Sequence, residues 1–276
     1  MHAPLLPVLY LSHGAPLFAI EAGSTGPALT RWGEALAQSQ TTGLRGIVIM
    51  SPHWMASAPA VMSNPAPATW HDFGGFPPAL YELQYPASGS PALAAEVSGL
   101  LKDAGIAADS DAERPLDHGA WVPLMHLFPK ADVPVVQVAL PENAGPAQVF
   151  AMGRALRNLR AQGVLLIGSG SMTHNLREFF GGAREPSPYV IEFSRWVEAT
   201  IARGDKAALL DYRRQAPHAQ RAHPSEDHFL PLFFALGAAA WGDEEAVQAD
   251  YLSREVMYGI LAMDSFALAP APVQPA

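Results

Sequence analysis

The chain of 276 residues contains no cysteine. This absence excludes disulfide bonds, thiolate metal sites and a cysteine nucleophile, so any bound metal has to be held by His, Asp or Glu. Lys and Arg number only 17 against 26 Asp and Glu, the net charge is -9, and no long basic cluster occurs. Because nucleic acids and anionic membranes require a basic surface, we expect neither as a partner and favour a small-molecule substrate.

Long hydrophobic runs are also missing. The apolar N-terminal segment MHAPLLPVLYLSHGAP is too short to cross a bilayer and has no basic start or small-residue cleavage site. We interpret it as a strand and expect a cytoplasmic protein. The motifs HExxH, GxGxxG and GxSxG are absent as well, and the segment GSGSM at 168–172 matches none of them. Nucleotide binding and serine hydrolysis are therefore not favoured.

Short apolar runs alternate with segments of helical period along the chain. The runs have the continuous hydrophobicity of strands covered on both faces, and they lie at residues 7–12, 46–51, 133–140 and 163–170. Apolar spacings of three and four predict helices at residues 26–38, 90–105, 144–163 and 187–204. This alternation predicts an α/β fold with a central, mostly parallel or mixed sheet flanked by helices. Ligands of such sheets bind beyond the carboxyl ends of the strands.

The sequence shows no internal repeat and no domain linker. Residues 58–91 form a long stretch rich in Pro, Gly and aromatic residues, which we interpret as a loop lying over the site. The ending ALAPAPVQPA is of low complexity. We therefore expect one catalytic domain over residues 1–266, followed by a flexible tail over residues 267–276 that carries no chemistry.

Three of the ten histidines follow predicted strands. His13 comes after VLYLS, His53 after IVIMSP, and His174 shortly after LLIGSG. A single histidine in such a place is usually a hydrogen-bonded loop residue. Three of them at strand ends indicate imidazoles converging on one point, where they could hold a metal.

A fourth candidate ligand is His228. The segment 224–227, with Pro, Ser and two acidic residues, favours a helix start and would place His228 in the first turn. His223 would remain in the preceding loop. A separation of five residues is poor spacing for one helix face, so we favour His228 over His223.

Other histidines have weaker signals. His118 lies between Asp117 and Gly119, where a substrate contact and simple loop packing are both open. His126 lies in an apolar helical segment and His2 at the terminus, so neither is expected to act. In HDFGGFP, the glycines and phenylalanines indicate a rigid aromatic loop beside a flat substrate, with His71 and Phe73 as its expected substrate contacts.

Together these segments resemble a known family, the class III extradiol ring-cleavage dioxygenases, and within it the DOPA extradiol dioxygenase-like branch. The resemblance runs in order along nearly the whole chain, through LYLSHGAP, SPHW, HDFGGFPPALYELQYPASGSP, LDHGAWVPLMHLFPKADVPVVQ, GSGSMTHNL and HPSEDHFLPLFFALGAA. It implies a LigB-like single-domain α/β fold. It also implies an enzyme that opens the ring of a catechol, DOPA-like or otherwise substituted, with O2 to give a semialdehyde.

The resemblance further implies one divalent metal ion per chain, Fe(II) for dioxygenase activity, with Zn(II) as the metal that such proteins can carry when isolated. By motif, His13, His53 and His228 look like the metal ligands, with His228 where the wider class has a glutamate. His174 resembles the catalytic acid/base and is also a possible fourth ligand. His118 resembles a histidine that contacts the substrate and can take part in catalysis.

Two alternatives remain open from the sequence. A zinc hydrolase could use the same imidazoles to lower the pKa of a bound water, and a non-catalytic metal protein would hold the ion in a closed site. Consumption of O2 discriminates between the dioxygenase and the hydrolase. We expect small aromatic diols and O2 as partners, in a monomer or small homo-oligomer.

Overall fold

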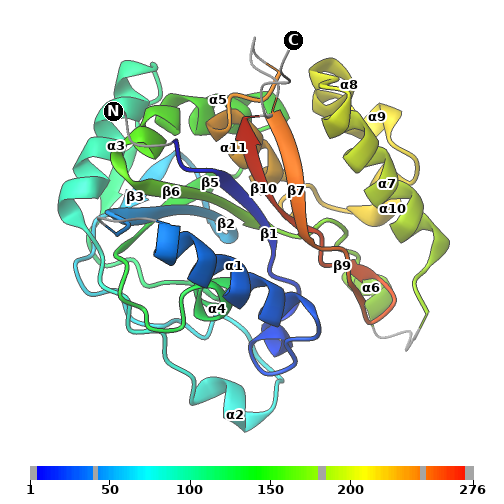
Figure 1. Cartoon of the computed structure of the whole chain (residues 1–276), viewed down its shortest axis with the longest axis horizontal. Helices are drawn as coiled ribbons and strands as arrows, with labels where there is room; N and C mark the ends of the chain where they lie inside the picture. The colour runs from blue at the N-terminus through cyan, green and yellow to red at the C-terminus, as the bar shows by residue number, and fades with distance from the viewer. Residues whose placement is uncertain (1–4, 40–42, 180–184, 243–246, 271–276) are drawn as a thin grey trace.

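The computed structural model describes residues 5–39, 43–179, 185–242 and 247–270. Within these residues, eight strands form one sheet in the order β4-β3-β5-β2-β6-β1-β10-β7 (Figure 1). They are β1 (Val8–Ser12), β2 (Gly46–Ala56), β3 (Ala60–Met62), β4 (Asp109–Asp111), β5 (Val135–Pro141), β6 (Val164–Gly170), β7 (Val247–Ser253) and β10 (Ser265–Pro270). A separate hairpin joins β8 (Val256–Met257) to β9 (Leu261–Ala262). His2 and residues 271–276 lie outside the described residues.

The four predicted strands form the centre of this sheet. β5, β2, β6 and β1 are neighbours and run parallel. β3 pairs antiparallel with β5, and β10 runs antiparallel between β1 and β7, so the sheet is mixed. The prediction of apolar strands covered on both faces is confirmed, because residues 8–12, 46–50 and 164–170 are all buried.

The four predicted helices are also confirmed. They are α1 (Thr25–Ser39), α3 (Pro91–Asp103), α5 (Pro146–Leu156), which continues as the 3-10 turn η2 (Arg157–Gln162), and α7 (Pro188–Ala202). The remaining helices are η1 (Pro16–Ala19), α2 (Pro78–Tyr81), α4 (His118–Leu127), α6 (Leu176–Phe179), α8 (Lys206–Leu210), α9 (Tyr212–Gln215), α10 (Ala219–Ala222) and α11 (Leu230–Ala238). Of the helices in the described ranges, none has the length and hydrophobicity needed to cross a membrane.

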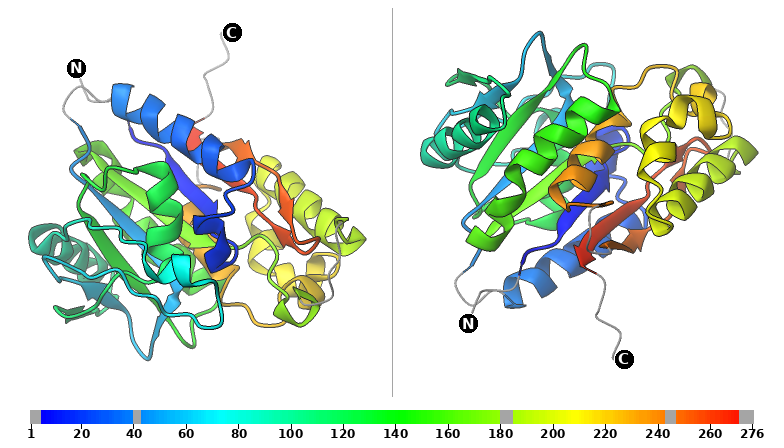
Figure 2. Two further views of the ribbon diagram at one scale, coloured as in Figure 1. Left: turned by 90° about the horizontal axis from the view of Figure 1, so that it is seen from below. Right: turned by 90° about the horizontal axis from the view of Figure 1, so that it is seen from above.

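The helices cover the sheet from both sides, as the two views of Figure 2 show. The apolar residues of α1, α4 and η1 pack on one face. Those of α3, α5, α7 and α11 pack on the other. The expected single-domain α/β fold with a mixed central sheet is therefore observed.

The predicted boundary of the flexible tail was wrong. Ala267 to Pro270 belong to β10, which hydrogen-bonds to β1 on one side and β7 on the other. Leu268 is fully buried, and Ala267 is 5% exposed. The alternation of alanine and proline concealed a strand, because its stability comes from two neighbouring strands rather than from its own propensity.

The predicted helix start at 224–227 was also wrong. α11 begins at Leu230, and His228 lies in the turn that precedes it. An earlier start would have placed Pro231 inside the helix, where it removes a backbone donor. The observed start places Pro231 in the first turn, where its missing N–H group is harmless.

Candidate active site

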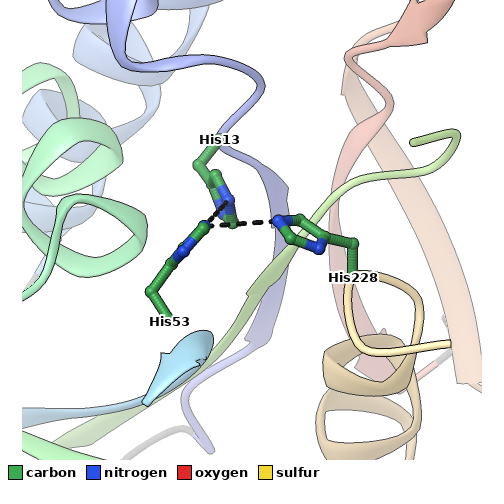
Figure 3. Close-up of side chains that lie close together, drawn as sticks. All are labelled: His13, His53 and His228. Carbon is green, nitrogen blue, oxygen red and sulfur yellow. Dashed lines mark hydrogen bonds between the residues drawn. The ribbon is translucent and has the colours of Figure 1, made fainter. Parts of the chain in front are cut away.

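Three imidazoles meet beyond the carboxyl ends of the central strands (Figure 3). His13 follows β1, His53 lies near the end of β2, and His228 lies in the turn before α11. The Nε2 atom of His53 is 3.1 Å from Nε2 of His13 and 3.2 Å from Nε2 of His228. The structure therefore brings together the three histidines that the sequence singled out as metal ligands.

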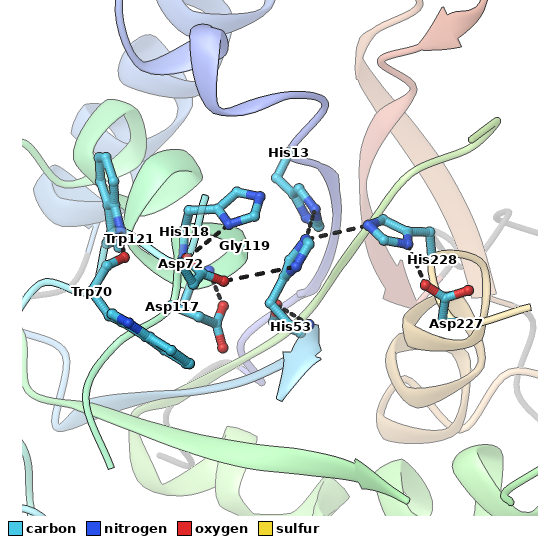
Figure 4. Close-up of polar contacts among 12 residues, drawn as sticks. His13, His53, Trp70, Asp72, Asp117, His118, Gly119, Trp121, Asp227 and His228 are labelled. Carbon is cyan, nitrogen blue, oxygen red and sulfur yellow. Dashed lines mark hydrogen bonds and ion pairs between the residues drawn. The ribbon is translucent and has the colours of Figure 1, made fainter. Parts of the chain in front are cut away.

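Hydrogen bonds at Nδ1 determine which nitrogen of each ring faces the centre. The hydroxyl of Ser169 donates a hydrogen bond to the carbonyl of Gly119 at 2.5 Å, so its oxygen accepts a hydrogen bond from Nδ1–H of His13 at 3.0 Å. Nδ1 of His228 donates to the carboxylate of Asp227 at 2.7 Å (Figure 4). Both rings therefore direct an unprotonated Nε2 toward His53.

This arrangement fits a metal ion better than a hydrogen-bonded cluster. A single proton on Nε2 of His53 could satisfy only one of the two lone pairs that face it. Metal–imidazole bonds are about 2.0–2.1 Å long, which places two nitrogens on one ion roughly 3 Å apart. The observed distances of 3.1 and 3.2 Å match that spacing. The three Nε2 atoms could thus hold one divalent ion.

The protonation state of the rings also suits a metal. Burial, and then the positive charge that neighbouring imidazoles would carry, hold the pKa of His13 and that of His53 well below the usual histidine range. Burial is the largest single influence on the pKa of Asp227 and would raise it, but the hydrogen bond and positive charge of His228, with smaller contributions from Ser225 and His174, together lower it. Neutral imidazoles with oriented lone pairs are the form that binds divalent metals.

Close backbone packing positions His228. The α-carbon of Gly170 in β6 faces the carbonyl oxygen of His228 so closely that a side chain at Gly170 would overlap it. The next residue, Ser171, donates its backbone N–H to that same carbonyl at 2.8 Å. The role of the glycines in GSGSM is therefore to let the turn before α11 pack closely against β6, and not to bind a phosphate group.

The partly buried side chain of Arg114 positions His53. The guanidinium of Arg114 donates to the carbonyl of His53 at 3.0 Å and to the carboxylate of Asp117 at 3.2 Å. Its central carbon also lies 4.9 Å from the ring centre of Trp54 and 4.8 Å from that of Trp70. Two aromatic faces and two acceptors leave Arg114 little freedom, so the end of β2 is fixed in place.

His118 is the first residue of α4, after the N-cap Asp117. Its ring centre lies 3.8 Å from that of His53. The carboxylate of Asp72 accepts hydrogen bonds from both the backbone N–H and Nδ1 of His118. Burial would raise the pKa of Asp72, but these hydrogen bonds lower it, so Asp72 is ionised and His118 is the donor. Nε2 of His118 is then the nitrogen left to accept a proton.

His174 lies on the opposite side of the triad. Its ring stacks on His228, with ring centres 3.5 Å apart and planes only 6° apart. Burial, and then the proximity of His228, lower the pKa of His174 to about 2. The ring is therefore neutral at pH 7. Stacking places the His174 ring against the face of His228, which is a candidate metal ligand.

A pocket of about 700 Å³ opens onto the site. His53, His118, His174 and His228 line its inner end, and Phe73 forms part of its wall. A metal held by the triad would therefore be accessible to a small molecule. Open sites of this kind are typical of catalytic metals, whereas structural zinc sites are closed by four protein ligands.

The structure places other singled-out residues outside the triad. His71 is not among the described residues that line the pocket. Its Nε2 forms a hydrogen bond with the carbonyl of Leu83 at 3.1 Å, and its ring packs edge-on against Phe73. His71 therefore supports the pocket-lining Phe73, in place of the direct substrate contact that we expected. His223 is buried and bonds with the carbonyl of Met172, while His126 bonds with that of Phe18.

Several residues that shape the site were missed by reasoning from the sequence. They are Asp72, Arg114, Ser169 and Asp227, each of which orients one of the histidines. Asp72 stands beside His71, an expected substrate contact, and Asp227 beside His228, a candidate ligand, so adjacency to a candidate site residue was a usable signal for both. Arg114 and Ser169 carried no such signal, because their partners are distant in the chain.

Comparisons with known proteins assign the chain to a family. Residues 7–263 match the family described as the catalytic LigB subunit of aromatic ring-opening dioxygenase. Two similar proteins are both named 4,5-DOPA dioxygenase extradiol. The one from Beta vulgaris is 34% identical over 93% of this chain and 94% of its own, and the one from Escherichia coli is 35% identical over 90% and 89%. A crystal structure of an uncharacterized Escherichia coli protein is also similar, with a TM-score of 0.73, 29% identity, and coverage of 95% of this chain and 99% of that one.

Proposed function

This chain belongs to the LigB family of aromatic ring-opening dioxygenases, and from that premise we propose that it opens the ring of a substituted catechol beside one of its two hydroxyl groups, using Fe(II) and one O2. The extradiol dioxygenase expected from the sequence is confirmed by this membership and by the named relatives. The metal, the catechol and the semialdehyde product are parts of the proposal.

One observation carries the proposal: three inward-facing Nε2 atoms stand at the inner end of a pocket that is open to small molecules. We assign the metal to His13, His53 and His228. When bound, Fe(II) would hold both catechol oxygens and O2 in one site and supply the redox chemistry. Zn(II) would fit the same neutral ligands and is the ion we expect in protein purified without added iron.

We assign hydrogen bonding to the substrate and proton transfer to the two remaining histidines of the pocket, His118 and His174. Nε2 of His118, with Asp72 behind Nδ1, is oriented to accept a hydrogen bond from a substrate hydroxyl. We assign proton transfer during ring opening to His174, which is neutral and lines the same pocket. A neutral imidazole can take a proton from one atom of the substrate and return it to another. Both atoms of O2 end in the open-chain product, so no external reductant is consumed.

The aromatic wall would orient the ring. The ring centre of Phe73 lies 5.6 Å from that of His118 and 5.4 Å from that of Phe76, and both ring pairs pack edge to face. A flat substrate that packs against this wall would present its hydroxyls to the histidines. The wall would also exclude water from the inner end of the pocket, which strengthens each hydrogen bond made there.

The test is O2 uptake by protein loaded anaerobically with Fe(II), measured on a panel of catechols together with the absorbance of the yellow ring-opened product. We expect one O2 per ring opened. Replacing His13, His53 or His228 by Ala should remove the metal, measured by elemental analysis, and the activity with it. His218→Asn is the matched control, since His218 is exposed and its positive φ tolerates Asn.

A second variant tests whether His174 is a metal ligand or a proton-transfer group. His174→Gln should keep its metal and bind catechol without O2, yet lose about two to four orders of magnitude in turnover. Loss of metal in this variant would make His174 a fourth ligand and pass proton transfer to His118. Iron-loaded protein that consumes no O2 with any catechol, but hydrolyses esters in its zinc form, would overturn the proposed reaction.

A further inference from the structure

The pocket is much larger than a catechol ring, and its outer part is apolar. A volume of about 700 Å³ lies in the range of sites for drug-sized ligands. Beyond the histidines its walls include Leu17, Phe76, Leu176 and Leu261. Leu176 is 52% exposed, an unusual degree of exposure for a large apolar side chain. Such a surface gains from contact with an apolar substituent on the ring.

One carboxylate stands at the rim of this apolar wall. Glu21 follows η1 on the same segment that leads out from His13, and it lines the pocket. The hydroxyl of Tyr258 donates to Oε2 of Glu21 at 2.7 Å. This bond restricts the orientation of the carboxylate at the pocket. Among the described pocket-lining residues, Glu21 carries the only carboxylate and none is Lys or Arg.

No Lys or Arg among the described pocket-lining residues offsets this charge. The net charge of the whole chain is -9, which also disfavours anions near the surface. The entrance is thus apolar with a negative rim.

We propose that Glu21 selects catechols whose ring substituent is apolar near the ring and ends in an ammonium group, and that it disfavours catechols ending in a carboxylate. This inference rests on the proposed function, because it takes the pocket as the catechol site. An ammonium at the rim forms an ion pair with Glu21, whereas a carboxylate is repelled by it. Exposed ion pairs contribute little, so the ratio between the two substrates should be about tenfold.

The test uses three catechols that share a two-carbon chain on the ring, with aminoethyl, ethyl and carboxyethyl substituents. For iron-loaded protein we expect kcat/KM to fall in that order, with the difference in KM rather than kcat. Glu21→Gln should reduce the ratio of aminoethyl to carboxyethyl to about threefold or less, and Glu21→Lys should invert it. Glu34→Gln, an exposed change on α1, should keep the ratio of the original protein. The ratio should also shrink between about 0.05 and 0.5 M salt, since screening weakens exposed pairs.

A binding measurement separates this inference from the proposed function. Calorimetric titration of the zinc-loaded protein with the same three catechols needs no turnover. Tighter binding of aminoethyl catechol that is lost in Glu21→Gln supports the inference even if no catechol consumes O2. Equal affinities for the aminoethyl and carboxyethyl compounds, or a ratio unchanged by Glu21→Gln, would overturn it while leaving the ring-opening proposal intact.

Discussion

Asp72 accepts two hydrogen bonds from His118, one from the backbone N–H and one from the ring Nδ1–H, each 2.9 Å long (Figure 4). The other carboxylate oxygen of Asp72 lies 3.8 Å from Nδ1 of His53. One side chain of the loop that precedes α2 therefore orients the first residue of α4 and stands beside a candidate metal ligand.

The first prediction concerns this carboxylate. In Asp72→Asn a neutral amide oxygen replaces the charged oxygen that accepts both bonds, so the bonds weaken and His118 loses part of its orientation and basicity. We expect kcat/KM with a catechol to fall about 10–100-fold while bound metal stays unchanged. Asp103→Asn, an exposed change on α3, is the control. Unchanged kcat/KM would remove Asp72 from catalysis, and loss of metal would show that it acts through His53.

The second prediction concerns Gly119, in the first turn of α4. An added Cβ there would overlap the Ser51 hydroxyl, and it would lie 2.8 Å from the His53 ring and 3.2 Å from the His13 ring. Gly119→Ala should therefore displace two ligands and weaken metal affinity at least about tenfold. Gly99→Ala in α3 meets nothing within 4 Å and should leave affinity unchanged. Competition with a chelator measures both, and equal affinities for the two variants would contradict the geometry.

The third prediction concerns β10. Leu268 is fully buried between β1 and β7, so Leu268→Ala should lower the free energy of unfolding by about 2–5 kcal/mol. Leu5→Ala, at a leucine that is 42% exposed, should cost much less. Urea unfolding followed by circular dichroism measures both. A cost below about 1 kcal/mol for Leu268→Ala would support the original expectation of a tail at these residues.

The fourth prediction concerns Asp264, which is 5% exposed. Burial raises its pKa to about 7 in the folded protein, from an ordinary value near 3.8. The folded state then binds the proton more tightly, so stability from this group is present below pH 4 and is lost as the pH rises to about 7. The loss amounts to at most about 4 kcal/mol.

Asp264→Asn removes the titration. We expect the variant to equal the original protein in stability near pH 4 and to exceed it at pH 8, judged by urea midpoints at both values. The difference between the two proteins cancels the pH dependence of the histidines, which they share. A variant less stable than the original at pH 8 would show that the charged carboxylate is satisfied in the fold.

Sequence patterns predicted the elements well where the pattern is local. The four central strands and four helices follow from apolar runs and from spacings of three and four, which depend only on the geometry of the chain itself. β10 escaped prediction because ALAPAP has weak intrinsic preference and is stabilised by β1 and β7, which lie on either side of it. Pro231 similarly moved the start of α11 to a place that the acidic residues did not suggest.

By itself, the sequence predicted that His13 and His53 would stand at one edge of an α/β sheet, because residues that follow parallel strands meet at the same edge. His228 joined them through the resemblance of its motif, and the structure brings the three together. Only the tertiary structure decided which nitrogen His13 turns inward and which carboxylate supports His118. Those choices depend on Ser169 and Asp72, whereas the partner of His228 is the adjacent Asp227. Ser169 is 156 positions from His13, and Asp72 is 46 positions from His118. Contacts of that separation arise from the packing of whole layers, which no local pattern of residues encodes.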